Sequence, residues 1–178
     1  LEVQNGRLVL DGGDNRLQAM AVVLGSTNDE SGVLQLGGAG GKSDQTFTGL
    51  TMAGAGTGNA VVGGASQIST LTLDIGANIT NIYTGMLGGA GLNENNMALV
   101  KSGDGILVLT SANTYTGITT VSDGILAVDA AHRLGGDPGS LITNQLTLDG
   151  GIFAAIGTFG MDVNRGIDAA VQGKLVCD

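Results

Sequence analysis

The side chains of this chain that could do acid–base chemistry are aspartates at the ends of predicted strands. Enzymes that hydrolyse polysaccharides need two carboxyl groups flanking the scissile bond. The candidates are Asp11, Asp129 and Asp149, and the first two occupy equivalent places in two similar segments. Asp-Gly pairs such as Asp11-Gly12 and Asp149-Gly150 are common in turns. We interpret these aspartates as turn residues and keep a polysaccharide lyase or hydrolase as the alternative.

A serine-protease site is the second possibility that the sequence raises. Residues 136–140, Gly-Asp-Pro-Gly-Ser, resemble the nucleophile motif of trypsin-like proteases, but Pro138 stands where the reactive serine would be. The single histidine, His132, lies in the same short stretch, so a triad assembled across a protease fold is not supported. We predict a Pro-Gly turn that begins at Asp137.

Nucleotide and metal sites are equally poorly supported. Residues 41–43, Gly-Lys-Ser, end like a phosphate-binding loop, but Leu36 stands where its first glycine is required and no strand-to-helix switch follows. Residues 88–93 partly resemble a calcium-binding nonapeptide, with Asn93 in place of the aspartate. One histidine and one cysteine exclude an ordinary zinc site. We predict no catalytic, cofactor-binding or metal-binding residues, and no cofactor.

The composition predicts an ordered chain with a narrow core. The 178 residues include 33 Gly but one Pro, three Phe, two Tyr and no Trp. Disorder needs low hydrophobicity and high charge, whereas this chain is 42% hydrophobic and 13% charged. The formal net charge of −9 comes without any basic patch, which argues against nucleic acid and anionic lipid as partners.

Residues 101–128, KSGDGILVLTSANTYTGITTVSDGILAV, contain two alternating strands and two glycine turns around an Asn-Thr-Tyr-Thr-Gly centre. This segment resembles the passenger-associated transport repeat of bacterial autotransporter passengers and giant surface proteins, with its best match over residues 99–128. Ile118 replaces the usual second glycine after Gly117, which we expect to stiffen that turn. The resemblance rests on Lys101, Gly103, Gly105, Leu107, Leu109, Ala112, Asn113, Tyr115, Gly117, Thr119, Thr120, Val121, Gly124, Leu126 and Val128.

The resemblance implies an all-β fold, a right-handed parallel β-helix exposed on the outside of a bacterium. With coils of about 20–25 residues, the chain would form roughly seven to nine coils and a solenoid about 35–45 Å long. Helix content should be very small, and the best helical candidate is a single turn within residues 128–134 that Gly135-Gly136 would close. Alternation of apolar and polar residues predicts strands at residues 7–10, 32–36, 46–52, 67–73, 79–83, 105–109, 119–121, 124–128 and 145–148.

The alternation also predicts which side chains face inward. Leu107 and Leu109 should stack on Leu126 and Val128, one coil later. We expect Asn113 to bond to the backbone at a corner, and Tyr115 to pack its ring there with its hydroxyl toward water. The predicted core residues are Leu107, Leu109, Val121, Leu126, Val128, Leu146 and Leu148. The predicted outward threonines are Thr70, Thr72, Thr80, Thr84, Thr114, Thr116, Thr119 and Thr120, a surface that could contact glycan or carry O-linked sugar.

The sequence also repeats itself, which is typical of a solenoid. Residues 3–11, VQNGRLVLD, are similar to residues 121–129, VSDGILAVD, at an offset of 118 residues. Residues 36–40 and 87–91 share Leu-Gly-Gly-Ala-Gly and should mark an equivalent corner about two coils apart. We therefore treat residues 1–178 as a single β-helix segment with about one and a half copies of a unit of 118 residues.

The ends of the chain suggest a piece of a longer protein. It begins with Leu1 without a leader pattern, and both ends read as strands without a cap. We expect either flanking coils of the same solenoid or copies of the chain stacked end to end. Cys177 is expected to be a buried strand thiol, with an intermolecular disulfide or a lipid anchor as alternatives. No apolar run is long enough to span a bilayer, so we expect no membrane insertion by this segment.

The sequence thus favours a non-catalytic extracellular stalk or scaffold at the bacterial cell surface, serving adhesion or fibre structure. The expected partners are further coils or copies of itself, with a host or matrix glycan or protein as a possible target. The alternatives are the carbohydrate-active enzyme and a module that only assists secretion by folding.

Overall fold

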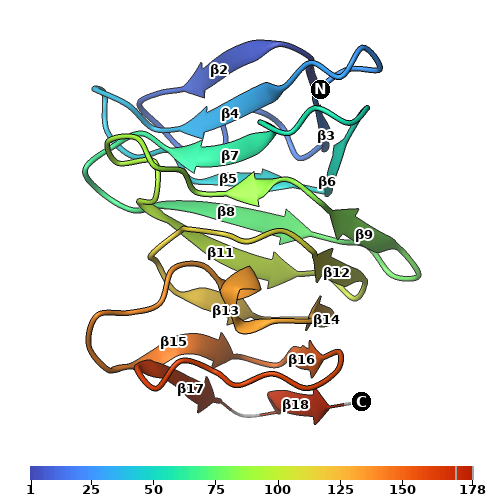
Figure 1. The fold of residues 1–178 in the computed structure, drawn as a ribbon, viewed down its shortest axis with the longest axis vertical. Coiled ribbons are helices and arrows are strands. Elements are labelled where there is room, and N and C mark those ends of the chain that lie inside the picture. Colours follow the sequence, from blue (N-terminus) through green and yellow to red (C-terminus); the bar gives the residue numbers. More distant parts are fainter. Residues whose placement is uncertain (171, 178) are drawn as a thin grey trace.

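The computed structural model describes residues 1–170 and 172–177 and shows a parallel β-solenoid of about seven turns (Figure 1). The chain winds around a narrow interior, and each strand pairs in parallel with the strand one coil away. The predicted parallel β-helix is therefore confirmed. None of the helices in the described residues is long and apolar enough to cross a membrane.

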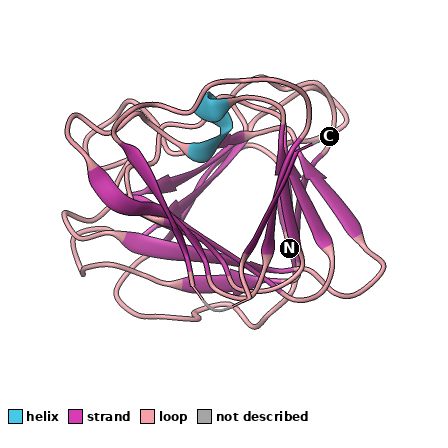
Figure 2. Cartoon of the chain, turned by 90° about the horizontal axis from the view of Figure 1, so that it is seen from below, coloured by secondary structure: helices cyan, strands magenta, loops and turns pink. Residues whose placement is uncertain are grey.

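Three walls surround the interior when the molecule is viewed along its long axis (Figure 2). The first wall is a six-stranded sheet of β5 (Gln45–Phe47), β8 (Ser69–Asp74), β11 (Met97–Ser102), β13 (Thr119–Val121), β15 (Ile142–Leu148) and β17 (Arg165–Ala169). The second wall begins with a four-stranded sheet of β2 (Gly6–Leu10), β4 (Gly32–Leu36), β7 (Ala60–Gly63) and β10 (Met86–Leu87).

The third wall consists of two sheets that follow one another along the solenoid. A three-stranded sheet contains β1 (Glu2–Val3), β3 (Ala21–Leu24) and β6 (Gly49–Met52). A five-stranded sheet contains β9 (Thr80–Tyr83), β12 (Ile106–Leu109), β14 (Ile125–Val128), β16 (Ile152–Ala155) and β18 (Lys174–Cys177). Between β6 and β9, the side chain of Asn81 bonds to both backbone groups of Leu50, at 2.7 Å each, and so links the two sheets.

The core is a stack of aliphatic side chains, because alternate residues of each strand point inward. Leu107 pairs with Leu126 and Leu109 with Val128, 19 residues later, as the sequence predicted. The seven predicted core residues are at most 1% exposed, so their inward orientation is confirmed. The interior also contains two fully buried tyrosines, Tyr83 and Tyr115, which fill more volume than the aliphatic residues around them.

Helical structure is confined to one 3-10 turn, η1 (Ala131–Leu134), among the described residues. Gly135 ends it with a positive φ of 85°, a conformation that glycine adopts without strain. The predicted short helix and its glycine stop are both confirmed.

One predicted strand is wrong because it joins two separate strands. Residues 46–52 form two strands, β5 and β6, which belong to different walls and meet at Thr48. The buried residues Phe47 and Leu50 are three positions apart, so the two-residue alternation breaks at this corner. That spacing is the sequence signal that marks the turn.

Several strands carry too little alternation to be predicted. Strand β7, Ala-Val-Val-Gly, is buried on both faces, which removes the polar outer positions on which an alternation search depends. Strand β11 does alternate in burial, but one of its inward positions is Lys101, a residue type that the sequence marks as exposed. The remaining unpredicted strands are β3, β10, β16 and β17, whereas β1 and β18 lie at the two ends that the sequence analysis read as strands.

The expected burial of Cys177 is wrong, because its thiol is free and exposed in β18. The same coil exposes other residues that occupy inward positions in the register. Ile167 is 41% and Leu175 is 52% exposed, although they pair with Leu146 and Phe153, which are buried. The interior is therefore open at this end of the described chain.

The internal repeats fall at different places in the solenoid. The two Leu-Gly-Gly-Ala-Gly segments follow β4 and β10, which lie in one sheet on either side of β7, so the equivalent corner two coils apart is confirmed. Residues 3–11 and 121–129 both form a strand, a turn and a strand, but β2 and β14 belong to different walls. The unit of 118 residues stays a prediction.

Candidate functional site: the buried polar corners of the repeat

The ammonium group of Lys101 lies inside the corner between β11 and β12. Its Nζ donates to the carbonyl oxygens of Ser102 at 2.7 Å, Gly103 at 2.6 Å and Asp123 at 3.3 Å. Burial lowers the pKa of Lys101, while the carboxylates of Asp74, Asp123 and Asp104 act in the opposite direction. Because two of the carbonyls come from its own turn and one from the next coil, Lys101 fastens the two corners together.

Glycines at this corner allow the turns of successive coils to approach closely. A Cβ atom on Gly105 would clash with the carbonyl oxygen of Gly76, and one on Gly124 would clash with that of Gly105. Gly124 also has a φ of +60°, which is strained for other residues. Backbone stacking thus explains why the repeat has glycine at these positions.

Asn113 connects three successive coils at the wall that continues the four-stranded sheet. Its Oδ1 accepts from the amide of Leu87 at 2.8 Å, and its Nδ2 donates to the carbonyl of Arg133 at 2.6 Å. Its own amide donates to the carbonyl of His132 at 3.0 Å. No regular strand continues at this corner. The Asn113 side chain therefore satisfies backbone groups that would otherwise bond to a neighbouring strand.

Tyr115 and Thr119 correct two sequence expectations. Tyr115 is fully buried, and its hydroxyl lies 2.7 Å from Oγ1 of Thr119, which is also fully buried. The expected exposure of the Tyr115 hydroxyl and of Thr119 is therefore wrong. A buried hydroxyl needs a partner, and the two side chains satisfy each other across four residues of the same turn. Burial raises the pKa of Tyr115 to about 12.

The other outward threonines behave as the alternation predicts. Thr80, Thr84, Thr114 and Thr116 are exposed, and Thr70, Thr72 and Thr120 are partly exposed.

The remaining repeat positions divide between wall and corner. Val121, Leu107, Leu109, Leu126 and Val128 fill the interior, whereas Ala112 is exposed and Gly103 turns the chain with a φ of +71°. Gly117 is buried against the preceding coil. A side chain at this position would clash with the backbone of Met97 and Ala98, so the position requires glycine. Ile118, the departure from the usual glycine, is 37% exposed and fits on the outer surface.

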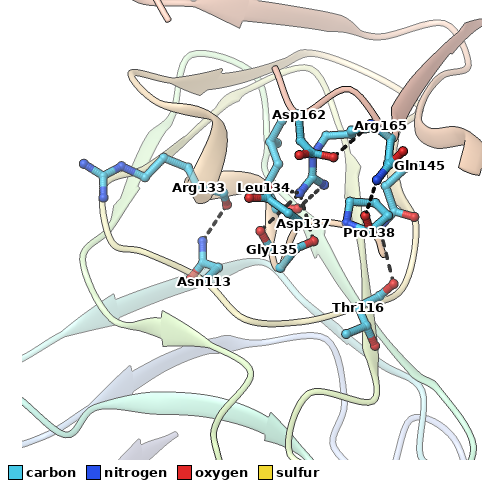
Figure 3. A network of polar contacts seen from close by, with 12 residues as sticks. Asn113, Thr116, Arg133, Leu134, Gly135, Asp137, Pro138, Gln145, Asp162 and Arg165 are labelled. Atoms are coloured by element: carbon cyan, nitrogen blue, oxygen red, sulfur yellow. Dashed lines mark hydrogen bonds and ion pairs between the residues drawn. The ribbon is translucent and has the colours of Figure 1, made fainter. Parts of the chain in front are cut away.

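A second buried cation, Arg165, lies at the start of β17 and was not predicted (Figure 3). Its guanidinium donates to the carbonyls of Leu134 at 2.7 Å, Gly136 at 2.9 Å and Gly135 at 3.2 Å, and approaches Oδ1 of Asp137 at 3.4 Å. The carbonyl groups left free after η1 are therefore satisfied by the next coil.

Near Arg165, the side chain of Gln145 bonds to the backbone of the preceding coil. Its Nε2 donates to the carbonyl of Gly117 at 3.0 Å and reaches that of Thr116 at 3.3 Å (Figure 3). Within the described residues, Oε1 of Gln145 and Nε of Arg165 have no hydrogen-bond partner. An unpaired buried polar atom costs about 1–3 kcal/mol, so this corner is less completely satisfied than the one at Asn113.

Sequence reasoning missed Arg165, Gln145 and the buried asparagines Asn59 and Asn81. Asn59 accepts from the amide of Gly32 at 2.9 Å and donates to the carbonyl of Gly56 at 2.8 Å. The position of Asn81 in its strand could have revealed its burial, because Asn81 and Tyr83 are alternate residues that both point inward. A polar residue at an inward position predicts a backbone partner when no other buried side chain can serve.

The aspartates considered for catalysis take structural or isolated positions. Asp11 accepts two hydrogen bonds, at 3.0 and 3.1 Å, from the amide of Gly40 in the next coil. Asp129 pairs with Arg133 four residues on, at 2.7 Å, and this contact lowers the pKa of Asp129. Asp149 is exposed in the turn after β15.

The other motifs are likewise engaged in folding contacts. Pro138 accepts a hydrogen bond from the side chain of Asn164 at 2.9 Å. Lys42 pairs with Asp44, and Ser43 donates to the carbonyl of Gly13 at 2.6 Å. Glu94, beside Asn93, accepts from the amide of Gly91 at 2.8 Å and pairs with Arg7 at 2.7 Å. Residues 1–170 and 172–177 contain no group of three His, Cys, Asp or Glu side chains placed to hold a metal ion.

The fold and its polar corners define a class of protein: a parallel β-solenoid whose buried polar side chains hold successive coils together. Residues 99–128 match the passenger-associated-transport-repeat family. The chain is 33% identical over 173 residues to the adhesin BmaC autotransporter of Brucella suis biovar 1 (strain 1330), a match that covers 93% of this chain and 5% of that protein. No solved structure matches the chain.

The chain therefore contains a passenger-associated transport repeat, and it is a parallel β-solenoid similar in sequence to part of an autotransporter adhesin. It spans about one twentieth of the length of the curated relative that it matches.

Proposed function

We propose that this chain is a non-catalytic stalk segment of a bacterial surface protein, which holds other parts of that protein away from the cell. The observation that carries the proposal is the use of buried polar groups. Lys101, Asn113, Asn81 and Arg165 each bond to the backbone of another coil. Hydrogen bonds between successive coils make the solenoid stiff, and a stalk needs that stiffness.

The similarity to an adhesin supports a role in attachment, in which the segment either presents a binding head or contacts the target itself. The target would be a host or matrix glycan or protein that meets the outer walls. The apolar interior exposed at Ile167 and Leu175 supports end-to-end contact with further coils or with another copy. The net charge of −9 without a basic patch favours neither nucleic acid nor anionic lipid.

The test places the chain between an outer-membrane anchor and an N-terminal epitope on a bacterium with a surface polysaccharide layer. A variant that lacks residues 106–124 should be exported equally well but show lower epitope access for antibody, because the stalk is one coil shorter. Equal access in both variants would contradict a stalk.

The same cells separate the two alternative functions. A module that only assists secretion would lose export when one coil is removed, without a change in access for each exported molecule. A polysaccharide lyase or hydrolase would release unsaturated or reducing sugar ends from added polysaccharide. We expect no such release, and turnover that disappears in Asp129→Asn but persists in the exposed control Asp168→Asn would contradict the non-catalytic proposal.

A further inference from the structure

The five-stranded sheet has an apolar outer face. Strand register places Ile106, Ile125 and Ile152 side by side in one outward column, between Thr80 on β9 and Lys174 on β18, and Ile82, Val108 and Ala127 in the next column. Their neighbours along each strand, such as Leu107 and Leu126, fill the interior. Ala127 is only 5% exposed, so we give the name apolar strip to the other five residues. Ile82 is 53% exposed, and the other four residues of the strip are partly exposed.

This face differs from the outer face of the six-stranded sheet, which carries the polar residues Thr70, Thr72 and Thr120 at its outward positions. The inner side of the five-stranded sheet is covered by the core. The outer side therefore presents a contiguous aliphatic surface of the kind that marks an interaction site.

Exposed carboxylates border the strip along one edge. Asp104, Asp123 and Asp149 lie in the turns that directly precede β12, β14 and β16, and all three are exposed. None of the ion pairs found within the described residues involves them. We call these three residues the acidic column. Asp104 and Asp123 occupy equivalent positions in successive coils, about 4.8 Å apart, and Asp149 lies one position earlier in the register of the next coil.

The dimensions of the strip select between possible occupants. Across β9, β12, β14 and β16 it is about 15–20 Å long and two side chains wide, so its area is a few hundred Å². A stable interface between two folded proteins needs about 800 Å² on each partner. A second copy would therefore have to bury much more than the strip.

A single helix fits both the size and the charge. About 14 helical residues extend over about 21 Å, and basic residues three or four positions apart recur every 4.5–6 Å or so along the helix, close to the coil spacing. We propose that the apolar strip and the acidic column together bind a cationic amphipathic helix that lies along the solenoid axis. Its apolar face covers the strip, and its lysines or arginines contact the acidic column.

The proposal is tested with the complete chain and a synthetic amphipathic peptide of leucine and lysine, 16 residues long, by fluorescence anisotropy. Ile125→Lys should weaken binding at least tenfold, because it places a like charge within the strip. Val100→Lys is the matched control, since Val100 faces outward from the six-stranded sheet, and it should leave binding within twofold of the parent.

A second pair of variants tests the charges through substitutions at exposed side chains. Asp104→Asn with Asp123→Asn should weaken binding and make it less sensitive to salt, whereas Glu2→Gln with Asp168→Asn removes the same charge elsewhere and should do neither. A scrambled peptide of identical composition should bind at least tenfold more weakly than the amphipathic one.

Three results would overturn the proposal. Equal binding of the scrambled peptide would show that the net charge of the peptide, and not its amphipathic helix, drives binding. Equal loss in Ile125→Lys and Val100→Lys would place the peptide elsewhere. A dimer in sedimentation equilibrium that Ile125→Lys abolishes, and that the peptide does not disrupt, would show that a second copy covers the strip.

Discussion

At the scale of single residues, stability depends on a narrow interior that offers no room for an unpaired charge. Each inward side chain is covered above and below by the neighbouring coils, as Leu107 is by Asn81 and Leu126. A polar group survives there only with a fixed partner, as Lys101 and Tyr115 show.

The substitution Leu107→Asp should therefore destabilise the fold by more than about 3 kcal/mol, because it buries an unpaired carboxylate. The matched control is Val108→Asp, the next residue of the same strand, which faces outward and should cost much less. Thermal unfolding followed by circular dichroism measures both. Equal melting temperatures for the two variants would mean that the inward register is wrong.

The buried tyrosines predict how stability depends on alkaline pH. Burial raises the pKa of Tyr115 to about 12 and also raises the pKa of Tyr83. Between pH 10 and pH 12 the unfolded chain loses the Tyr115 proton while the folded chain keeps it, so stability falls as the pH rises. The share of Tyr115 is about 2–3 kcal/mol across this window.

Lys101 acts in the opposite sense and in an earlier window. Its pKa is lowered in the folded state, so stability rises with pH until the unfolded lysine also loses its proton near its ordinary value of 10.5. Urea unfolding between pH 9 and pH 11.5 should show a net decline above pH 10.5. That decline should be shallower in Tyr115→Phe, and an unchanged slope would contradict the assigned burial.

At the scale of elements, the sequence predicted strands where one side of a wall is polar and failed where that contrast is missing. Residues 67–73 alternate polar and apolar side chains and were found, whereas β7 has no polar side and was not. Strands β12 and β14 also lack a polar side, and their match to the transport repeat located them. Within the polar corners, glycine and asparagine types pointed to turns at Gly103, Gly124 and Asn113. The partners of Lys101 and Arg165 were not predictable, because they are carbonyl groups brought close only when coils stack.

The coil as a unit gives a prediction about deletion. Ile106 and Ile125 occupy the same position in successive coils, so removing residues 106–124 joins Gly105 to Ile125 in the original register. We expect this variant to fold, with an unchanged β-type far-UV spectrum and a cooperative melt. Removing residues 106–123 instead shifts the following strand by one residue and turns its apolar side chains outward.

The shorter deletion is the control, since it removes almost the same sequence. It should lose cooperative unfolding or aggregate during refolding. If both variants melted alike, inward and outward positions would be interchangeable, and the stacked core could not be what holds the coils together.

At the scale of the whole solenoid, the strands at the two ends of the described residues have an edge without a neighbour in the described chain. Strands β17 and β18 each pair with one neighbour in the described chain, so one edge of each presents backbone groups that can pair with another strand. Ile167 and Leu175 add apolar side chains to the same end. A surface that combines open strand edges with an open core favours another solenoid end as its cover.

The isolated chain should therefore self-associate, with a mass in light scattering that grows with concentration. Such head-to-tail contacts do not close on themselves, so the products should be open chains of varying length rather than one defined oligomer. Leu175→Arg together with Ile167→Glu should shift the distribution toward monomer, because both charges would be buried in the contact. Leu92→Arg is the control, since Leu92 is 91% exposed on a side loop and should leave association unchanged. A strictly monomeric parent whose terminal strands are protected from hydrogen exchange would contradict end-to-end contact and show that the chain closes its own ends.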